Sequence, residues 1–149
     1  MHVVLVEPQI PQNTGNIARL CAITRSELHL VRPLGFETSN YYLKRAGLDY
    51  WDKVQLVFHN SFESFWKDHG SHRCWYLSAG ACTPYTKARF EEEDYLIFGN
   101  ETDGLPESFI LSNQQIGLTI PMWNDTRCLN LSNAVAIVLY EALRQVRGF

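Results

Sequence analysis

The sequence predicts an α/β fold in which helices cover both faces of a parallel sheet. Short apolar runs alternate along the chain with segments of helical period, which is the order expected of parallel strands joined by helical crossovers. Runs such as VVLV and YLIF are apolar without alternation, which indicates strands buried on both sides. The chain has 149 residues, 46% of them hydrophobic, so we expect residues 1–149 to form one domain with a proper core.

The elements follow in order along the chain. Strands are predicted for residues 2–6, 28–31, 54–58, 75–77, 95–98 and 116–120. Helices are predicted for residues 14–24, 40–46, 61–67 and 107–111 and for the C-terminal segment, and a longer loop for residues 79–90.

Charge and composition limit the partners and the compartment. The formal net charge is -3, so binding to nucleic acid would depend on local basic patches rather than on the whole surface. No apolar run approaches the length of a membrane span, and Met1 leads directly into HVVLV without a basic leader, which predicts a cytoplasmic protein. The four cysteines fit neither a zinc ribbon nor a CxxC motif and are interpreted as reduced thiols.

Three late strands change abruptly from bulky apolar residues to small or polar ones. The changes occur where Leu77 passes into SAG, Phe98 into GNE and Ile120 into PMWN. Ligands of open parallel sheets bind at the carboxyl ends of strands, so these ends predict a ligand site in the C-terminal half. The first strand has no GxGxxG fingerprint, which argues against an ordinary dinucleotide site there. Glycines also occur at ordinary turns of α/β proteins, so each strand end alone leaves both interpretations open.

The C-terminal segment, residues 127–147, is the clearest predicted helix. Ser132 or Asn130 can cap it. Its apolar stripe at helical spacing consists of Leu131, Val135, Val138, Leu139, Ala142 and Val146, and further apolar residues flank the stripe. So wide an apolar face is typical either of a symmetric subunit interface or of a deeply buried core helix.

Three motifs carry a family resemblance. NTGNIARLC (13–21), LIFGNETDGLP (96–106) and IPMWNDTRCLNLSNAVAIVLYEALRQ (120–145) resemble the three ordered motifs of the SpoU branch of the SPOUT methyltransferases. With the opening VLVEPQIPQNTGNIARLCA and the short length, the chain is most similar to the TrmL (YibK-like) family of tRNA ribose methyltransferases.

The resemblance implies a fold, a cofactor, a partner and a reaction. The fold is an α/β/α SPOUT domain whose last loops and helix form a trefoil knot, a rare exception to unknotted topology. The family binds S-adenosylmethionine in that knot and acts as a homodimer on tRNA. It methylates the ribose 2'-hydroxyl of the anticodon wobble nucleotide, a cytidine or uridine, typically in leucine tRNAs.

The same resemblance assigns the cofactor site to the three strand ends. Gly99 and Gly104 would let the backbone approach the cofactor closely, while Asn100 and Glu101 would place polar groups at the pocket's edge. The expected cofactor-binding residues are Leu77, Ser78, Gly99, Asn100, Glu101, Gly104, Ile120, Met122, Cys128 and Leu129. Many relatives carry serine at the position of Cys128, which favours a backbone contact there over a side-chain role.

The catalytic residues implied by the resemblance are Arg19, Glu101, Asn13 and Asn130. A guanidinium stays protonated in proteins, so Arg19 is expected to hold a phosphate beside the reacting ribose rather than to act as a simple base. Glu101 would anchor Arg19 or the substrate ribose. Asn13 and Asn130 would orient the site or cap helices, and both interpretations stay open.

The remaining polar features receive plainer interpretations. His69 and His72 are expected to lie in a polar loop, and no metal site is expected. The acidic run at residues 91–94 is interpreted as a solvated connection. Basic residues that could contact tRNA are Arg19, Lys44, Arg45, Lys87, Arg89, Arg127, Arg144 and Arg147.

Two alternatives to a tRNA methyltransferase remain at this point. One is a cofactor-binding RNA-interaction or assembly factor without turnover, and the other is a methyltransferase for another RNA. Retention of Arg19, Glu101 and Asn130 together favours the enzyme.

Overall fold

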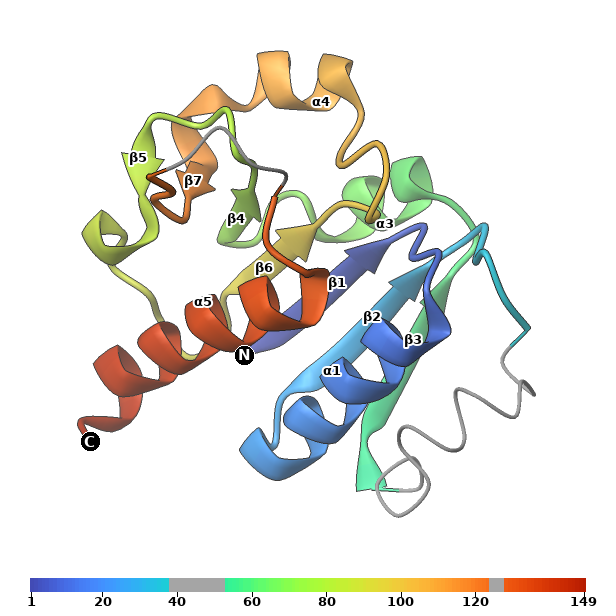
Figure 1. Ribbon diagram of the computed structural model, residues 1–149, viewed down its shortest axis with the longest axis horizontal. Helices are drawn as coiled ribbons and strands as arrows, with labels where there is room; N and C mark the ends of the chain where they lie inside the picture. Colours follow the sequence, from blue (N-terminus) through green and yellow to red (C-terminus); the bar gives the residue numbers. More distant parts are fainter. Residues whose placement is uncertain (38–52, 124–127) are drawn as a thin grey trace.

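The computed structural model describes residues 1–37, 53–123 and 128–149, and within them the chain forms a seven-stranded sheet with helices on both faces (Figure 1). The strand order is β3-β2-β1-β6-β4-β7-β5, and each of these pairings is parallel. The strands are β1 (His2–Val6), β2 (Glu27–Val31), β3 (Gln55–His59), β4 (Cys74–Leu77), β5 (Thr83–Pro84), β6 (Tyr95–Phe98) and β7 (Gly117–Thr119). The helices are α1 (Pro11–Thr24), α3 (Phe62–His69), α4 (Glu107–Ser112) and α5 (Leu131–Arg147), with short 3-10 turns η2 (Tyr85–Lys87) and η3 (Gln114–Ile116). The predicted α/β class is confirmed.

The apolar runs without alternation became strands buried on both faces. In β1, Val3 and Leu5 belong to the core beneath α1 and α5, while Val4 and Val6 belong to the core beneath α3 and α4. Figure 1 shows α1 and α5 side by side over one face of the sheet. The sheet is therefore the middle layer of three, as both apolar faces of β1 require.

The loop predicted for residues 79–90 was wrong in part. Residues 79–90, expected to be a loop, contain β5 and η2, and β5 pairs only Thr83 and Pro84 with β7 at the sheet edge. So short an edge strand leaves no periodic signal. The helix expected at residues 40–46 lies outside the described residues.

Helix α1 begins at Pro11, three residues before the predicted start. Its N-cap is Ile10, which makes no side-chain capping bond. The expectation that Asn13 caps this helix is wrong, because Asn13 lies inside the first turn with its side chain directed elsewhere. Proline suits the first helical turn because its φ is preset and its missing N–H would lack an intrahelical partner anyway.

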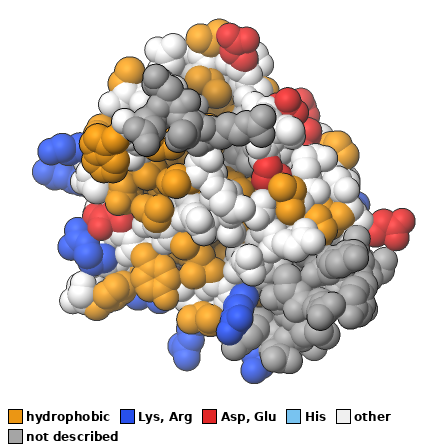
Figure 2. Space-filling model, viewed as in Figure 1, with side chains coloured by type: hydrophobic (Ala, Val, Ile, Leu, Met, Phe, Trp, Pro, Cys, Tyr) orange, Lys and Arg blue, Asp and Glu red, His pale blue; other side chains and the backbone are white. Residues whose placement is uncertain are grey.

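Helix α5 has a buried apolar stripe and a partly exposed apolar flank. Asn130 caps it, accepting from the Ser132 backbone N–H, and the stripe from Leu131 to Leu143 is buried against the sheet. On the flank, Ile137 and Tyr140 remain 36% and 44% exposed. Figure 2 shows hydrophobic side chains gathered over this helix. The stripe is therefore core, and within the described residues the flank stays partly exposed.

The acidic run at residues 91–94 is not uniformly solvated. Asp94 is 1% exposed and accepts hydrogen bonds from Arg73 Nε (2.8 Å), Trp75 Nε1 (2.8 Å) and the Glu91 backbone N–H (3.0 Å). The solvated interpretation is wrong for Asp94 because its partners come from β4 and the loop before it, which the local sequence does not reveal. It is right for the three exposed glutamates that precede it.

Two further findings concern the cysteines and the helices. No disulfide joins the cysteines, of which Cys21 and Cys74 are buried and Cys82 and Cys128 exposed. Among the helices of the described ranges, none combines the length and apolarity that a membrane crossing needs.

Candidate active site

A cavity of about 750 Å³ opens at the carboxyl ends of β4, β6 and β7, beside the start of α5. Its size is that of a small-molecule site. The residues expected to bind a cofactor all line it: Leu77, Ser78, Gly99, Asn100, Glu101, Gly104, Ile120, Met122, Cys128 and Leu129. Asn13 and Asn130 line it as well. The three strand ends therefore meet at one place, as the parallel topology requires.

The loop after β6 is closed tightly on itself. Asn100 and Gly104 exchange backbone hydrogen bonds of 3.2 Å, and Gly104 has a φ of 73°. A Cβ on Gly99 would overlap the Gly104 backbone. Gly99 and Gly104 are thus already required by the loop's own closure, independently of any ligand.

Asn100 uses its side chain to shape this loop. Its Oδ1 accepts from the backbone N–H groups of Thr102 (3.0 Å) and Asp103 (2.6 Å), the geometry of an Asx turn. The amide oxygen is therefore committed to the loop, and Asn100 is one of the residues that line the cavity.

Glu101 leaves this loop and reaches the start of α1. Its Oε2 accepts from the Gln9 backbone N–H (2.8 Å), and its Oε1 accepts from the Ile10 backbone N–H (3.2 Å) and from Asn13 Nδ2 (2.9 Å). A carboxylate at the N-terminus of a helix satisfies donors that have no intrahelical partner and interacts favourably with the helix dipole. Glu101 thus holds the residues that lead into α1, and of the two interpretations left open for Asn13 the structure favours orientation of the site over helix capping.

Asn13 extends the contact to the third motif. Asn130 Nδ2 donates to Asn13 Oδ1 (2.9 Å), and Asn130 Oδ1 accepts from the Ser132 backbone N–H (2.9 Å) at the start of α5. In this series of hydrogen bonds each group donates to the next one, and the last acceptor is the carboxylate of Glu101. The three motifs, separated by up to 117 residues, are joined by one directed hydrogen-bond network at the cavity wall.

The structure does not bring Arg19 into this cluster. Arg19 lies on α1 six residues after Asn13, which rotates its side chain about 240° around the helix axis and moves it about 9 Å along it. It is exposed and is absent from the described residues that line the cavity. The three hydrogen bonds to the Glu101 carboxylate come from Gln9, Ile10 and Asn13, at or just before the first turn of α1.

Sequence reasoning missed Gln9 and Ile10, which contribute backbone N–H groups, and the apolar wall from Leu131 and Ala134. A backbone donor leaves no signature in residue type. The segment EPQIP, with two prolines, was a sequence signal that this turn is specialised, and the structure gives Glu7 a positive φ there.

The basic residues proposed for tRNA differ in their surroundings. Arg144 pairs with Glu141 (2.8 Å) and Arg147 with Glu92 (3.5 Å), so their charges are partly compensated within the chain. Lys87 and Arg89 are exposed near β5. Lys44, Arg45 and Arg127 lie outside the described residues.

Comparison with known proteins gives consistent matches over nearly the whole chain. A relative from Bacillus subtilis (strain 168), a "Putative tRNA (cytidine(34)-2'-O)-methyltransferase", is 47% identical over 97% of this chain and 92% of its own length. The "tRNA (cytidine(34)-2'-O)-methyltransferase" of Saccharophagus degradans is 44% identical over 99% of this chain and 96% of its own.

Solved structures of methyltransferases have the same fold as this chain. A chain from work on the 2-OH methylation of C/U34 on tRNA superposes with a TM-score of 0.93 at 48% identity, covering 99% of this chain and 97% of that one. The SpoU methyltransferase AviRb of Streptomyces viridochromogenes, solved with AdoMet, has a TM-score of 0.84 at 21% identity, which establishes likeness of fold. The model of the SpoU rRNA methylase family matches residues 1–140, and this chain belongs to that family.

Proposed function

We propose that this protein transfers a methyl group from S-adenosylmethionine to the ribose 2'-hydroxyl of nucleotide 34 of tRNA. The observation that carries the proposal is that three motifs far apart in the sequence line one cavity and share one hydrogen-bond network. Near-full-length relatives named for this reaction on cytidine 34 support it.

The residues present suit S-adenosylmethionine. Leu77, Ile120 and Leu129 offer apolar surface for the adenine, and the tight glycine loop offers backbone groups at close range. When bound, the sulfonium of this cofactor supplies a methyl group that is already electrophilic. The protein's work is then to align the ribose oxygen, exclude water and favour loss of the hydroxyl proton.

The network of Glu101, Asn13 and Asn130 would position the cavity wall rather than abstract the proton. Both carboxylate oxygens of Glu101 already accept hydrogen bonds from the chain. Its role in this proposal is to hold the start of α1 against the loop after β6, so that the ribose meets a fixed surface.

Arg19 would act from outside this chain's cavity. Its exposed guanidinium would hold a tRNA phosphate, which would orient the ribose and favour a developing alkoxide. A second copy of the chain would cover the exposed flank of α5, giving the homodimer implied by the sequence. The trefoil knot, the leucine isoacceptors and the cytoplasmic location are further parts of this proposal.

One observation favours a second candidate, a factor that binds the cofactor and RNA without turnover. It is the position of Arg19 outside the cavity. A methyltransferase for another RNA would use the same chemistry and differ only in substrate.

The test is mass spectrometry of nucleosides from tRNA and from ribosomal RNA after incubation with the protein and isotopically labelled S-adenosylmethionine. We expect labelled 2'-O-methylated cytidine or uridine at position 34 of tRNA. Arg19→Ala should abolish the label while leaving calorimetric affinity for S-adenosylhomocysteine unchanged. Lys67→Ala, an exposed cation on α3, is the matched control and should retain full activity. Binding of cofactor without label on tRNA in the wild-type protein would reject the proposal.

A further inference from the structure

The histidines of this chain gather on one side of the sheet. The sequence contains five, at positions 2, 29, 59, 69 and 72, and each has another histidine ring centroid within 6.0 Å. They come from β1, β2, β3, the end of α3 and the loop after it. Sequence reasoning considered only His69 and His72, which are neighbours along the chain.

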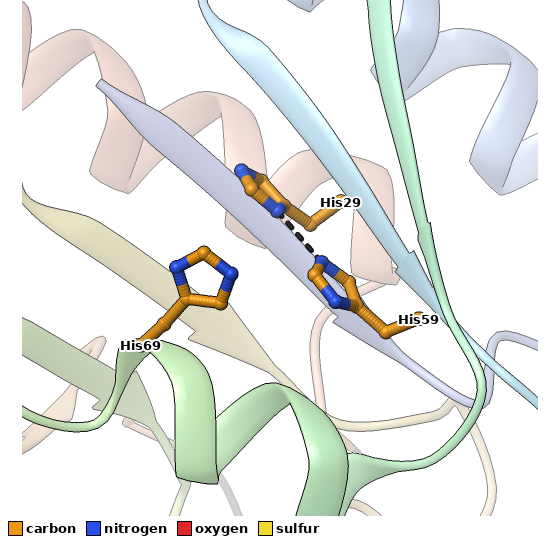
Figure 3. Close-up of side chains that lie close together, drawn as sticks. All are labelled: His29, His59 and His69. Atoms are coloured by element: carbon orange, nitrogen blue, oxygen red, sulfur yellow. Dashed lines mark hydrogen bonds between the residues drawn. The ribbon is translucent and has the colours of Figure 1, made fainter.

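Three of the five rings converge on one point (Figure 3). One nitrogen from each of His29, His59 and His69 lies within 4.8 Å of the others. His29 Nδ1 and His59 Nε2 are 2.9 Å apart. In the register of β2 and β3, His29 lies opposite Val57. His59 lies two residues after Val57 on β3, so its side chain points to the same face of the sheet as that of His29.

The remaining nitrogens of two rings have partners of their own. His29 Nε2 lies 3.1 Å from Glu27 Oε1, and His69 Nδ1 lies 3.1 Å from the Tyr95 hydroxyl. If each of these nitrogens holds the proton, the other nitrogen of each ring offers a lone pair to the centre. A histidine that binds a metal generally donates its second N–H to a carboxylate or similar acceptor in this way.

Burial keeps the three imidazoles neutral. His29 is 1% and His59 8% exposed. Burial, with the neighbouring histidines, lowers the pKa of His29 to about 3. Burial and an adjacent histidine also lower the pKa values of His59 and His69. At neutral pH each ring therefore carries a single proton. With the His29 proton on Nε2, His59 Nε2 donates to His29 Nδ1, so a bound cation requires only that the His59 proton shift from Nε2 to Nδ1.

We propose that His29, His59 and His69 form a binding site for one Zn²⁺ ion. Neutral imidazoles are preferred ligands of Zn²⁺, and water would complete a tetrahedron. A tetrahedral ion with bonds of about 2.0–2.1 Å holds its nitrogens about 3.3 Å apart. The present separations, from 2.9 Å up to at most 4.8 Å, reach that value by modest ring rotations.

A neighbouring group, His2, Glu27 and His29, uses the other nitrogen of His29. A neutral imidazole has one free lone pair, so His29 serves one of the two groups at a time. The three-histidine group is chosen because it leaves Glu27 as the acceptor that orients His29.

The ion would be structural. None of the three histidines lines the cavity, and they lie on the face of the sheet covered by α3. A ligand that joins β2, β3 and the end of α3 binds only the folded chain, so it raises stability by mass action.

The experiment uses tag-free protein, because a histidine tag would itself bind zinc. After equilibrium dialysis against micromolar Zn²⁺, the metal content is measured by mass spectrometry and the melting temperature by calorimetry, with and without EDTA. We expect one Zn²⁺ per chain and a higher melting temperature that EDTA reverses.

Variants separate this site from other zinc ligands. His69→Gln and His59→Gln should each weaken Zn²⁺ binding by about tenfold or more and lose the thermal shift. His72→Gln, exposed and three residues from His69, is the matched control and should keep both. Circular dichroism in EDTA verifies that each variant folds. The proposal would be overturned if no Zn²⁺ bound, if both ligand variants bound Zn²⁺ as tightly as the wild-type protein, or if Cys82→Ser or Cys128→Ser lost binding instead.

Discussion

Replacement of Glu101 with glutamine tests the network that joins the three motifs. The carboxylate accepts on both oxygens, from two backbone N–H groups and from the amide of Asn13. Glutamine keeps one oxygen and replaces the other with an NH₂ donor, which would face donors. A flip of Asn13 cannot repair this, because its oxygen already accepts from Asn130.

The size of the effect follows from these contacts. A hydrogen bond to a charged group contributes about 1.5–3 kcal/mol, and the substitution removes at least one of three. Glu101 is only half-buried, so water replaces part of what is lost. We expect the free energy of unfolding to fall by about 2–3 kcal/mol.

Urea unfolding followed by circular dichroism measures this directly, with the midpoint shifting at constant m-value. Glu107→Gln, an exposed carboxylate in the first turn of α4, is the matched control and should change stability by less than about 0.5 kcal/mol. If Glu101→Gln behaved like this control, the network would be incidental to the site.

Three other predictions follow from single features. Gly99→Ala should weaken S-adenosylhomocysteine binding, measured by calorimetry, because its Cβ overlaps the Gly104 backbone; unchanged affinity would show that the loop yields easily. The pKa of His29 is lowered in the folded protein, so as pH falls the unfolded chain binds a proton at this position before the folded chain does. The free energy of unfolding of the metal-free protein should therefore fall between about pH 6.5 and pH 3, by about 1.4 kcal/mol per pH unit for each such proton. His29→Gln should flatten that slope in urea titrations at several pH values, and a slope equal to wild type would contradict the assignment. Tyr140→Glu on the exposed flank of α5 should convert a dimer to a monomer in sedimentation without loss of helix signal, whereas a variant that still sediments as a dimer would move the interface elsewhere.

Much of the fold was predictable because burial on both faces leaves an unbroken apolar run. VVLV and YLIF became β1 and β6 with the expected bounds. The strand ends were predictable for a related reason, since parallel topology puts every carboxyl end at one edge. The individual lining residues came from the resemblance of the three motifs to the SpoU family.

What the sequence could not show depends on register and on backbone groups. Glu101 is held by the backbone of Gln9 and Ile10, whose side chains carry no trace of that role. The burial of Asp94 depends on Arg73 and Trp75, which lie about twenty residues away.

The histidine cluster shows the same limit. His29, His59 and His69 occupy three separate elements, and only the pairing of β2 with β3 and the packing of α3 bring them together. No local spacing contains that information.

The central claim is that the ends of β4, β6 and β7 and the start of α5 form one cofactor cavity. A crystal structure of the complex with S-adenosylhomocysteine tests it most directly. The account predicts ligand density against Leu77, Gly99, Ile120 and Leu129. Density at the edge of β2 and β3, or on the outer face of α5, would contradict it.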